Sequence, residues 1–281
     1  MASDKKIVLV TGGNTGLGYE IVKALYQSPT PYEIIIGSRS LSKAENAIAT
    51  VQKEVPQSPS TLSTVQVDLE SDEILEKAID TIRARHGRLD ALVNNAGGSY
   101  DPSVQGGRPN LRDSFNATWN LNVSGTHVLT TLAVPLLLLA SRDDNNNPRV
   151  VFVTSGTASL AESDVVSDPN HARINASPAA GWPKEGPRLA LSALSAYRAS
   201  KTGLNMVARE WVRVLKNDGV KIFLVSPGFL ATGLGGVGAE RLKEMGALDP
   251  SVGGNLVKDV VEGKRDGDVG KVIRRTDVQP W

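Results

Sequence analysis

VLVTGGNTGLGYEI, residues 8–21, joins an apolar run to a turn that is nearly free of large side chains. Such a turn fits a phosphate-binding loop, an ordinary tight turn or a flexible hinge. Gly12, Gly16 and Gly18 lie between a predicted strand and a predicted helix, where the backbone can approach a pyrophosphate and the helix N-terminus favours its negative charge. Because a glycine pattern alone is weak evidence, other parts of the chain must decide among the three interpretations.

Composition narrows the class of protein. The 281 residues can bury a large core, and 40% hydrophobic with 22% charged residues is typical of soluble proteins. With 31 Lys and Arg against 30 Asp and Glu, the net charge of +1 does not favour a nucleic-acid partner. The chain has no cysteine, which excludes disulfides, thiol nucleophiles and cysteine metal sites.

No membrane partner is expected from the apolar runs. The first of them, residues 7–10, is far too short for a signal peptide. The longest, residues 132–140, contains Pro135 and falls well below the about 20 residues of a membrane helix. We therefore expect 132–140 to be a buried helix end and the protein to be cytoplasmic.

Short β-branched runs alternate with longer stretches of helical periodicity. The runs are almost continuously hydrophobic, as in parallel strands covered on both faces. This order predicts one α/β domain over residues 1–281, with a doubly wound, mostly parallel Rossmann-type sheet in a three-layer α/β/α arrangement. The predicted strands are 6–12, 33–38, 63–68, 89–97, 149–155 and 220–228, and the predicted helices are about 16–28, 41–54, 71–85, 109–140 and 192–217.

The end of the second predicted strand distinguishes between the two nicotinamide cofactors. NAD enzymes of this fold carry an acidic residue about 20 residues after the glycines, where it binds the ribose 2′-hydroxyl. Here that position is Ser38, and Arg39 follows it. A guanidinium can bind a 2′-phosphate that a carboxylate would repel, although a solvated arginine is the alternative interpretation. The sequence thus predicts NADP(H).

SAYRASK, residues 195–201, places Tyr197 and Lys201 four residues apart on one face of a predicted helix. Such a pair is often a mere surface contact, but this one opens the helix that follows a strand ending in Ser155. A free tyrosine has a pKa of about 10, and a nearby ammonium and an oxidised nicotinamide would both lower it. The pair is therefore a candidate general acid/base and its activating cation.

These motifs together resemble those of the short-chain dehydrogenase/reductase family, from Thr11 to PGFLAT at 227–232. The glycine pattern Thr-Gly-x-x-x-Gly-x-Gly and the NNAG stretch at 94–97 carry the resemblance together with the Tyr/Lys pair. An isolated NNAG is also an ordinary Asn/Gly turn. Its coincidence with the first motif argues against that simpler interpretation.

The resemblance implies a role for each of four catalytic residues. Tyr197 would act as general acid/base, and Lys201 would lower its pKa and hold the nicotinamide ribose. Ser155 would hydrogen-bond the substrate oxygen. Asn122, which begins an Asn-x-x-Gly pattern ending at Gly125, would anchor a water in a proton relay to Lys201.

The same resemblance assigns residues to the cofactor and requires no metal. Asp68 would contact the adenine, Asn95 and Ala96 would lie along the adenosine ribose, and PGFLAT would close over the nicotinamide carboxamide and the pyrophosphate. The full predicted cofactor set is Gly12, Asn14, Thr15, Gly16, Leu17, Gly18, Ser38, Arg39, Asp68, Leu69, Asn95, Ala96, Gly97, Tyr197, Lys201, Pro227, Gly228, Leu230 and Thr232.

One stretch departs from the pattern of many family members, in which the serine and the tyrosine lie much closer together. Ser155 and Tyr197 are separated by an irregular segment at about 157–190, and a segment of this length is usually a lid or a binding loop. A similar insertion marks the carbonyl-reductase-like branch, which includes plant salutaridine- and menthone-type reductases. The resemblance implies that it covers the substrate pocket and favours a monomer or homodimer over a tetramer. A plain surface loop is the alternative interpretation of the insertion. Trp182, within it, would either line the pocket or anchor the loop by packing. A substrate flap is expected at about 232–250.

The predicted reaction is NADPH-dependent reduction of a ketone or aldehyde of a small organic substrate to an alcohol, with Tyr197 as the acid. A non-enzymatic NADP-binding protein of the same fold is the alternative, because fold does not fix function. That alternative predicts the loss of catalytic residues, yet all four are present. A hydrolase is disfavoured because the chain has no Gly-x-Ser-x-Gly elbow. Nothing in the sequence specifies the substrate.

Overall fold

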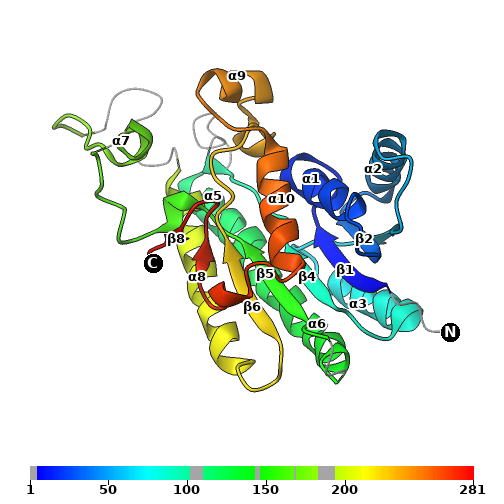
Figure 1. The fold of residues 1–281 in the computed structure, drawn as a ribbon. Helices are drawn as coiled ribbons and strands as arrows, with labels where there is room; N and C mark the ends of the chain where they lie inside the picture. The colour runs from blue at the N-terminus through cyan, green and yellow to red at the C-terminus, as the bar shows by residue number, and fades with distance from the viewer. Residues whose placement is uncertain (1–4, 102–109, 143–145, 168, 183–193) are drawn as a thin grey trace.

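The computed structural model describes residues 5–101, 110–142, 146–167, 169–182 and 194–281 (Figure 1). The strands in these ranges join into one eight-stranded sheet. All six strands that the sequence predicts are present, with ends shifted by a few residues. The strands are β1 (Lys6–Thr11), β2 (Tyr32–Ser38), β3 (Thr61–Gln66), β4 (Ala91–Asn94), β5 (Arg149–Val153), β6 (Lys221–Val225), β7 (Val272–Ile273) and β8 (Val278–Gln279).

The strand order in the sheet is β3-β2-β1-β4-β5-β6-β7-β8. Neighbours from β3 to β7 are parallel, and β8 is antiparallel to β7. The prediction of a doubly wound, mostly parallel Rossmann-type sheet is confirmed. Because the strand order reverses between β1 and β4, this topology places a ligand at the carboxyl ends of those two strands.

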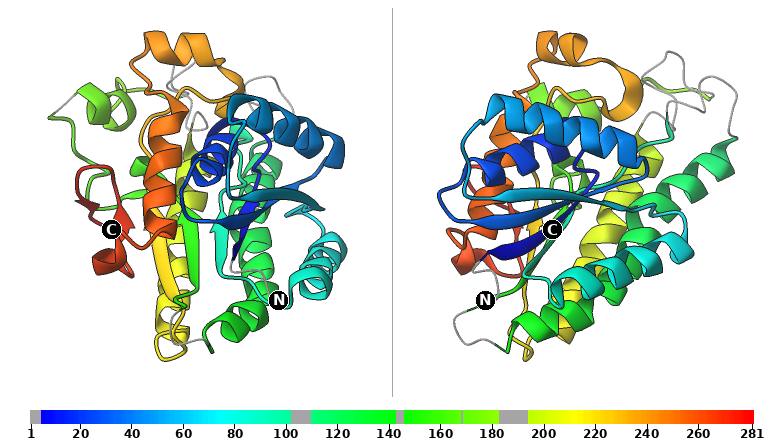
Figure 2. Two further views of the ribbon diagram at one scale, coloured as in Figure 1. Left: turned by 45° about the vertical axis from the view of Figure 1, so that its right-hand side comes forward. Right: turned by 90° about the vertical axis from the view of Figure 1, so that its right-hand side faces the viewer.

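Helices cover both faces of the sheet and complete the three layers (Figure 2). One face carries α1 (Gly16–Tyr26), α2 (Leu41–Glu54) and α10 (Pro250–Val261), and the other carries α3 (Asp72–His86), α6 (Gly125–Ala140) and α8 (Ser195–Val214). Ile21 and Val257 belong to the core on the first face, and Leu129 and Leu204 to the core on the second. Each such side chain contributes about 1.5–3 kcal/mol to folding when it is fully buried.

The helix predicted at 109–140 consists of three parts where it is described. α5 (Leu111–Trp119) leads into one π-helical turn, η1 (Asn120–Ser124), and then into α6. By length and composition the run from Leu111 to Ala140 could cross a membrane, but half of its most apolar window is buried within the protein. Leu136 and Leu137 are fully buried in the core, which matches the expected buried helix end.

Three further helices were not predicted as such. α7 (Pro169–Asn175) lies in the segment expected to be irregular, so that expectation is wrong for those residues. α9 (Ala239–Glu244) lies in the expected substrate flap, and α10 begins at that flap's end. Residues 168 and 183–190 of the predicted insertion lie outside the described ranges. Whether the insertion is a lid and 232–250 a flap remains a prediction.

Gly125 provides a test of the packing between α6 and the loop after β3. A Cβ atom at Gly125 would lie 1.8 Å from the carbonyl oxygen of Leu69, so Gly125→Ala must displace backbone. We expect this substitution to lower the free energy of unfolding by about 1–3 kcal/mol or more in chemical denaturation. Gly267→Ala is the matched control, because a Cβ there would meet no atom within 4 Å. Equal stability of the two variants would contradict the close packing.

Candidate active site

The glycine turn between β1 and α1 is closed to side chains. Gly12 and Gly16 have φ angles of 64° and 55°, which favour glycine. A Cβ at Gly18 would lie 2.1 Å from the carbonyl oxygen of Gly12, so only glycine lets the start of α1 approach the turn this closely. The turn is thus a rigid cradle of bare backbone at a helix N-terminus, and the hinge interpretation does not fit it.

The NNAG stretch after β4 braces this cradle. The Thr11 hydroxyl accepts hydrogen bonds from the backbone N–H groups of Asn95 and Ala96, at 3.0 and 2.9 Å. The Asn95 side chain donates in return to the Thr11 carbonyl at 2.8 Å. Asn94 points away from this edge and donates to Thr130 of α6. The Asn95 side chain therefore holds the glycine turn, and its predicted contact with the ribose stays a prediction.

Beside the cradle lies an open hollow of about 380 Å³. Lys43, on the first turn of α2, lines it, and sequence analysis did not single this lysine out. Arg39 does not line it; its side chain is 68% exposed, and its guanidinium lies 3.9 Å from the Glu70 carboxylate. Two cations therefore stand near the end of β2. The lining residues of the hollow are Asn14, Thr15, Tyr19, Lys43, Asn46, Ala47 and Thr50.

The predicted residues at the end of β3 hold the local backbone. The Asp68 carboxylate accepts a hydrogen bond from the Glu70 N–H at 3.1 Å. Leu69 is 4% exposed, and its carbonyl lies against Gly125. Ser38, at the end of β2, is buried and accepts from the Ser40 N–H at 3.3 Å. The cofactor contacts expected of these residues stay predictions.

The structure brings the predicted serine and tyrosine together. Ser155 follows β5, and Tyr197 lies in the first turn of α8. The Ser155 side chain lies close enough to the Tyr197 hydroxyl to act to lower its pKa. Burial acts in the opposite direction and prevails, so the pKa of Tyr197 is raised. The Ser155 hydroxyl also contacts the Thr157 hydroxyl at 3.0 Å and accepts from the Thr157 N–H at 3.2 Å.

Lys201 lies one turn further along α8 and is 5% exposed. Its ammonium donates to the Val153 carbonyl at 2.9 Å and lies 5.9 Å from the centre of the Tyr197 ring. Burial lowers the pKa of Lys201 to about 8. Lys201 is not among the groups that shift the pKa of Tyr197 here, so the expected lowering by this ammonium is not seen. It stays a prediction for the cofactor-bound site.

Asn122 lies in the π-helical turn η1, and such turns are frequent at functional sites. Its side chain accepts from the Gly98 N–H at 2.9 Å and donates to the Gly98 carbonyl at 2.8 Å and to the Ser200 hydroxyl at 2.9 Å. A Cβ at Gly97 would lie 2.7 Å from the side-chain Oδ1 of Asn122 and 3.4 Å from the Lys201 ammonium. The fourth predicted catalytic residue is therefore next to Lys201.

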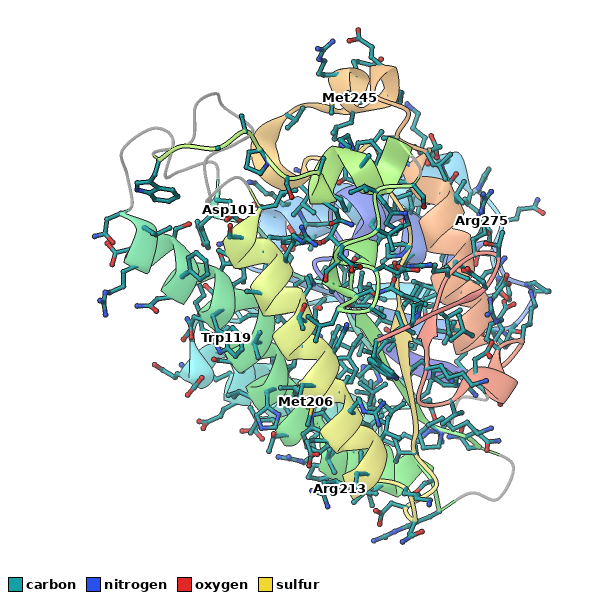
Figure 3. All side chains as sticks on the ribbon, turned by 90° about the vertical axis from the view of Figure 1, so that its left-hand side faces the viewer. Asp101, Trp119, Met206, Arg213, Met245 and Arg275 are labelled. Atoms are coloured by element: carbon teal, nitrogen blue, oxygen red, sulfur yellow. The ribbon has the colours of Figure 1, made fainter. Side chains whose placement is uncertain are left out.

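Asp101 is a residue of this site that sequence analysis missed. Its carboxylate is 1% exposed and accepts hydrogen bonds from the N–H groups of Ala196 and Tyr197, each at 2.9 Å. Figure 3 shows Asp101 at the end of α8. The residue at the N-cap position of α8 is Leu194, which cannot cap a helix, so Asp101 supplies the cap from a distant part of the chain.

The loop after β6 packs near the glycine turn. A Cβ at Gly16 would lie 3.5 Å from the Cβ of Thr232, and Gly228 has a φ angle of 98°. Pro227 and Leu230 contact Gly253 of α10, where a Cβ would lie 3.0 and 2.8 Å from their side chains. This places the predicted PGFLAT stretch beside the cradle.

Arg198 holds the described part of the insertion against this site. Arg198, next to Tyr197, donates to the Thr157 and Ile174 carbonyls and to the Asn175 side chain, at 3.0–3.2 Å. Trp182 is 74% exposed, so its ring does not anchor the insertion by packing.

Comparison with known proteins gives the family of this chain. The family model of short chain dehydrogenases matches residues 6–166. The chain therefore belongs to the short-chain dehydrogenase family of oxidoreductases. Short-chain dehydrogenase/reductase eupG of Phoma sp is 44% identical over 287 residues, which cover 100% of this chain and 99% of the relative. Short-chain dehydrogenase/reductase tropE of Talaromyces stipitatus is 43% identical over 280 residues, with 99% of each chain covered.

Solved structures show the same fold. The NADPH-bound carbonyl reductase from chicken fatty liver superposes with a TM-score of 0.75 at 19% identity, over 99% of both chains. At this level of identity the likeness concerns the fold.

Burial of Lys201 makes a prediction about pH. The folded protein holds this lysine at a pKa of about 8, below its value of 10.5 in the unfolded chain, so the unfolded state binds more protons between these pH values. The stability of the wild type should therefore rise relative to that of Lys201→Met, by about 3 kcal/mol from pH 8 to 10.5. Denaturation of both proteins across this range measures the difference. A difference that does not change with pH would contradict the lowered pKa.

Proposed function

We propose that this protein is an NADP(H)-dependent reductase that converts a ketone or aldehyde of a small organic substrate to an alcohol. The observation that carries the proposal is that Ser155 lies close enough to Tyr197 to act on its pKa, beside the buried Lys201, whose ammonium lies 5.9 Å from the centre of the Tyr197 ring. This group lies at the same edge of the sheet as the glycine cradle. A purely NADP-binding protein would not need a tyrosine hydroxyl held in this way.

The residues present fit a dinucleotide. Gly12, Gly16 and Gly18 form a turn of bare backbone at a helix N-terminus suited to a pyrophosphate, with positive φ at Gly12 and Gly16 and no room for a Cβ at Gly18. Thr232 lies beside the same cradle. The nicotinamide cofactor, when bound, supplies the hydride for the carbonyl carbon.

The chain's own residues position the substrate and move the proton. The Ser155 hydroxyl holds the substrate oxygen, and the Tyr197 hydroxyl donates a proton to that oxygen. Because burial raises the pKa of Tyr197, the hydroxyl is protonated at neutral pH, as reduction requires. The Lys201 ammonium, with its pKa of about 8, stays cationic at neutral pH and stabilises the tyrosinate that proton donation leaves.

Arg39 and Lys43 support the choice of NADP(H). Both are cations near the end of β2, where an NAD enzyme would carry an acid. Glu70, in the loop after the neighbouring strand β3, is an acid that lies 3.9 Å from Arg39. The chicken liver carbonyl reductase of the same fold is bound to NADPH, which is in line with this choice.

Tyr197→Phe tests the reaction. The variant keeps the ring but loses the proton donor, so carbonyl reduction should fall by about 10²–10⁴-fold while NADPH binding is retained. A panel of ketones and aldehydes, followed by the absorbance of NADPH, measures the rate. If no carbonyl compound is consumed by the wild type, or if Tyr197→Phe changes no rate, the proposal of an enzyme fails.

Arg39→Ala and Lys43→Ala test the cofactor. Each variant should weaken NADPH binding by about tenfold or more, because a charge-assisted hydrogen bond to the 2′-phosphate is lost. NADH, which has no such phosphate, is the internal control and should bind each variant as it binds the wild type. Calorimetry measures the affinity of each protein for both cofactors. A wild type that binds NADH more tightly than NADPH would refute the role of these cations.

A further inference from the structure

The segment Arg274–Trp281, drawn in red in Figure 1, contacts the loop that carries Ser155. Gln279 of β8 is 2% exposed, and its side-chain N–H donates to the Ser155 carbonyl at 3.2 Å. The backbone N–H of Ala161 donates to the Trp281 carbonyl at 2.8 Å. The peptide group of Ser155 is therefore held by a residue 124 positions further along the chain.

Arg274 fixes which way the Gln279 amide points. The Arg274 side chain donates to the Gln279 carbonyl oxygen at 3.2 Å. Since a guanidinium has donors only, the amide must turn its oxygen to Arg274 and its nitrogen to Ser155. The two ends of the amide are thus satisfied in one orientation, and a rotated amide would place two donors against each other and two acceptors against each other.

Glu162 in turn fixes Arg274. The Glu162 carboxylate pairs with the guanidinium through both of its oxygens, one contact being 3.0 Å. Both side chains are about four-fifths buried. Such a two-contact pair holds the planar guanidinium in one plane, which a lysine could not do. Glu162 lies in the segment between Ser155 and Tyr197. The series of contacts from Glu162 through Arg274 and Gln279 to Ser155 therefore begins in that segment and ends at the serine that precedes it.

We propose that Gln279 is a positioning residue for Ser155, and that the Glu162–Arg274 pair sets the orientation in which Gln279 acts. This inference rests on the proposed function for its catalytic consequence. The Gln279 amide keeps the Ser155 peptide group in place, and the Ser155 hydroxyl then stays between Thr157 and Tyr197. Through Arg274 and Gln279, Glu162 connects the insertion to the Ser155 peptide group.

Gln279→Leu is the first test, because leucine fills a similar space and cannot donate to Ser155. We expect kcat for carbonyl reduction to fall by about three- to tenfold, with little change in NADPH binding. The nearby Ser155 side chain acts to lower the pKa of Tyr197, so moving Ser155 away raises that pKa. Reduction needs protonated Tyr197 and is lost as pH rises through its pKa. The alkaline limb of the pH–rate profile should therefore move to higher pH.

Arg274→Lys is the second variant, and it keeps the charge facing Glu162 without the fork that reaches Gln279. It should shift the pH profile in the same direction by a smaller amount. Arg275→Ala is the matched control: Arg275 is exposed on the same segment and is labelled in Figure 3. This control should leave kcat and the pH profile unchanged.

Hydrogen–deuterium exchange separates this inference from the proposed function. The amides of residues 155–158 should exchange faster in Gln279→Leu than in Arg275→Ala, at equal melting temperatures. Unchanged exchange overturns the positioning role, whether or not the protein reduces a carbonyl. An unshifted pH profile in an active Gln279→Leu variant overturns it as well. Faster exchange in a protein whose wild type consumes no carbonyl compound supports the positioning of the loop and refutes the proposed function.

Discussion

The close approach of α1 to the turn after β1 is the constraint on which the rest of the site depends. At Gly18 a Cβ would lie 2.1 Å from the Gly12 carbonyl oxygen and 2.5 Å from the Asn95 side chain. One missing methyl group thus lets a helix, a strand end and the turn after β4 meet at one point. Because β1 and β4 are neighbours in the sheet, this contact also fixes the distance between the cradle and the residues that follow β4 and β5.

The backbone of Tyr197 is held by the side chains of Asp101 and Ser200. The Tyr197 N–H is held by Asp101, and its carbonyl accepts from the Ser200 hydroxyl at 2.8 Å. Ser200 in turn accepts from Asn122. The backbone of the tyrosine is therefore fixed on both sides before any substrate arrives, which is the form of preorganisation that orientation-dependent catalysis needs.

Local sequence signals predicted the parts of the molecule that local physics determines. The strands were readable because they are almost continuously apolar, and the cradle because glycine at Gly18 has no substitute. α10 carried readable signals too, since Asp249 caps it and Pro250 occupies its first turn. This helix was not predicted because it contains Gly253 and Gly254, and glycine disfavours helices. In the structure, Gly254 permits close contact with the backbone of Glu20 in α1.

Two of the residues that sequence analysis missed, Asp101 and Gln279, act over long separations. Asp101 caps a helix 95 residues away, and Gln279 reaches Ser155 across 124 residues, so no spacing rule points to either. Both are polar side chains that are buried almost completely, and a buried polar group is costly unless its partners are in place. Because of this cost, both side chains favour one arrangement: Asp101 and Gln279 have their hydrogen-bond partners only when α8 and the Ser155 loop occupy the positions seen here. Burial thus turns two ordinary polar residues into constraints on the geometry of Tyr197 and Ser155.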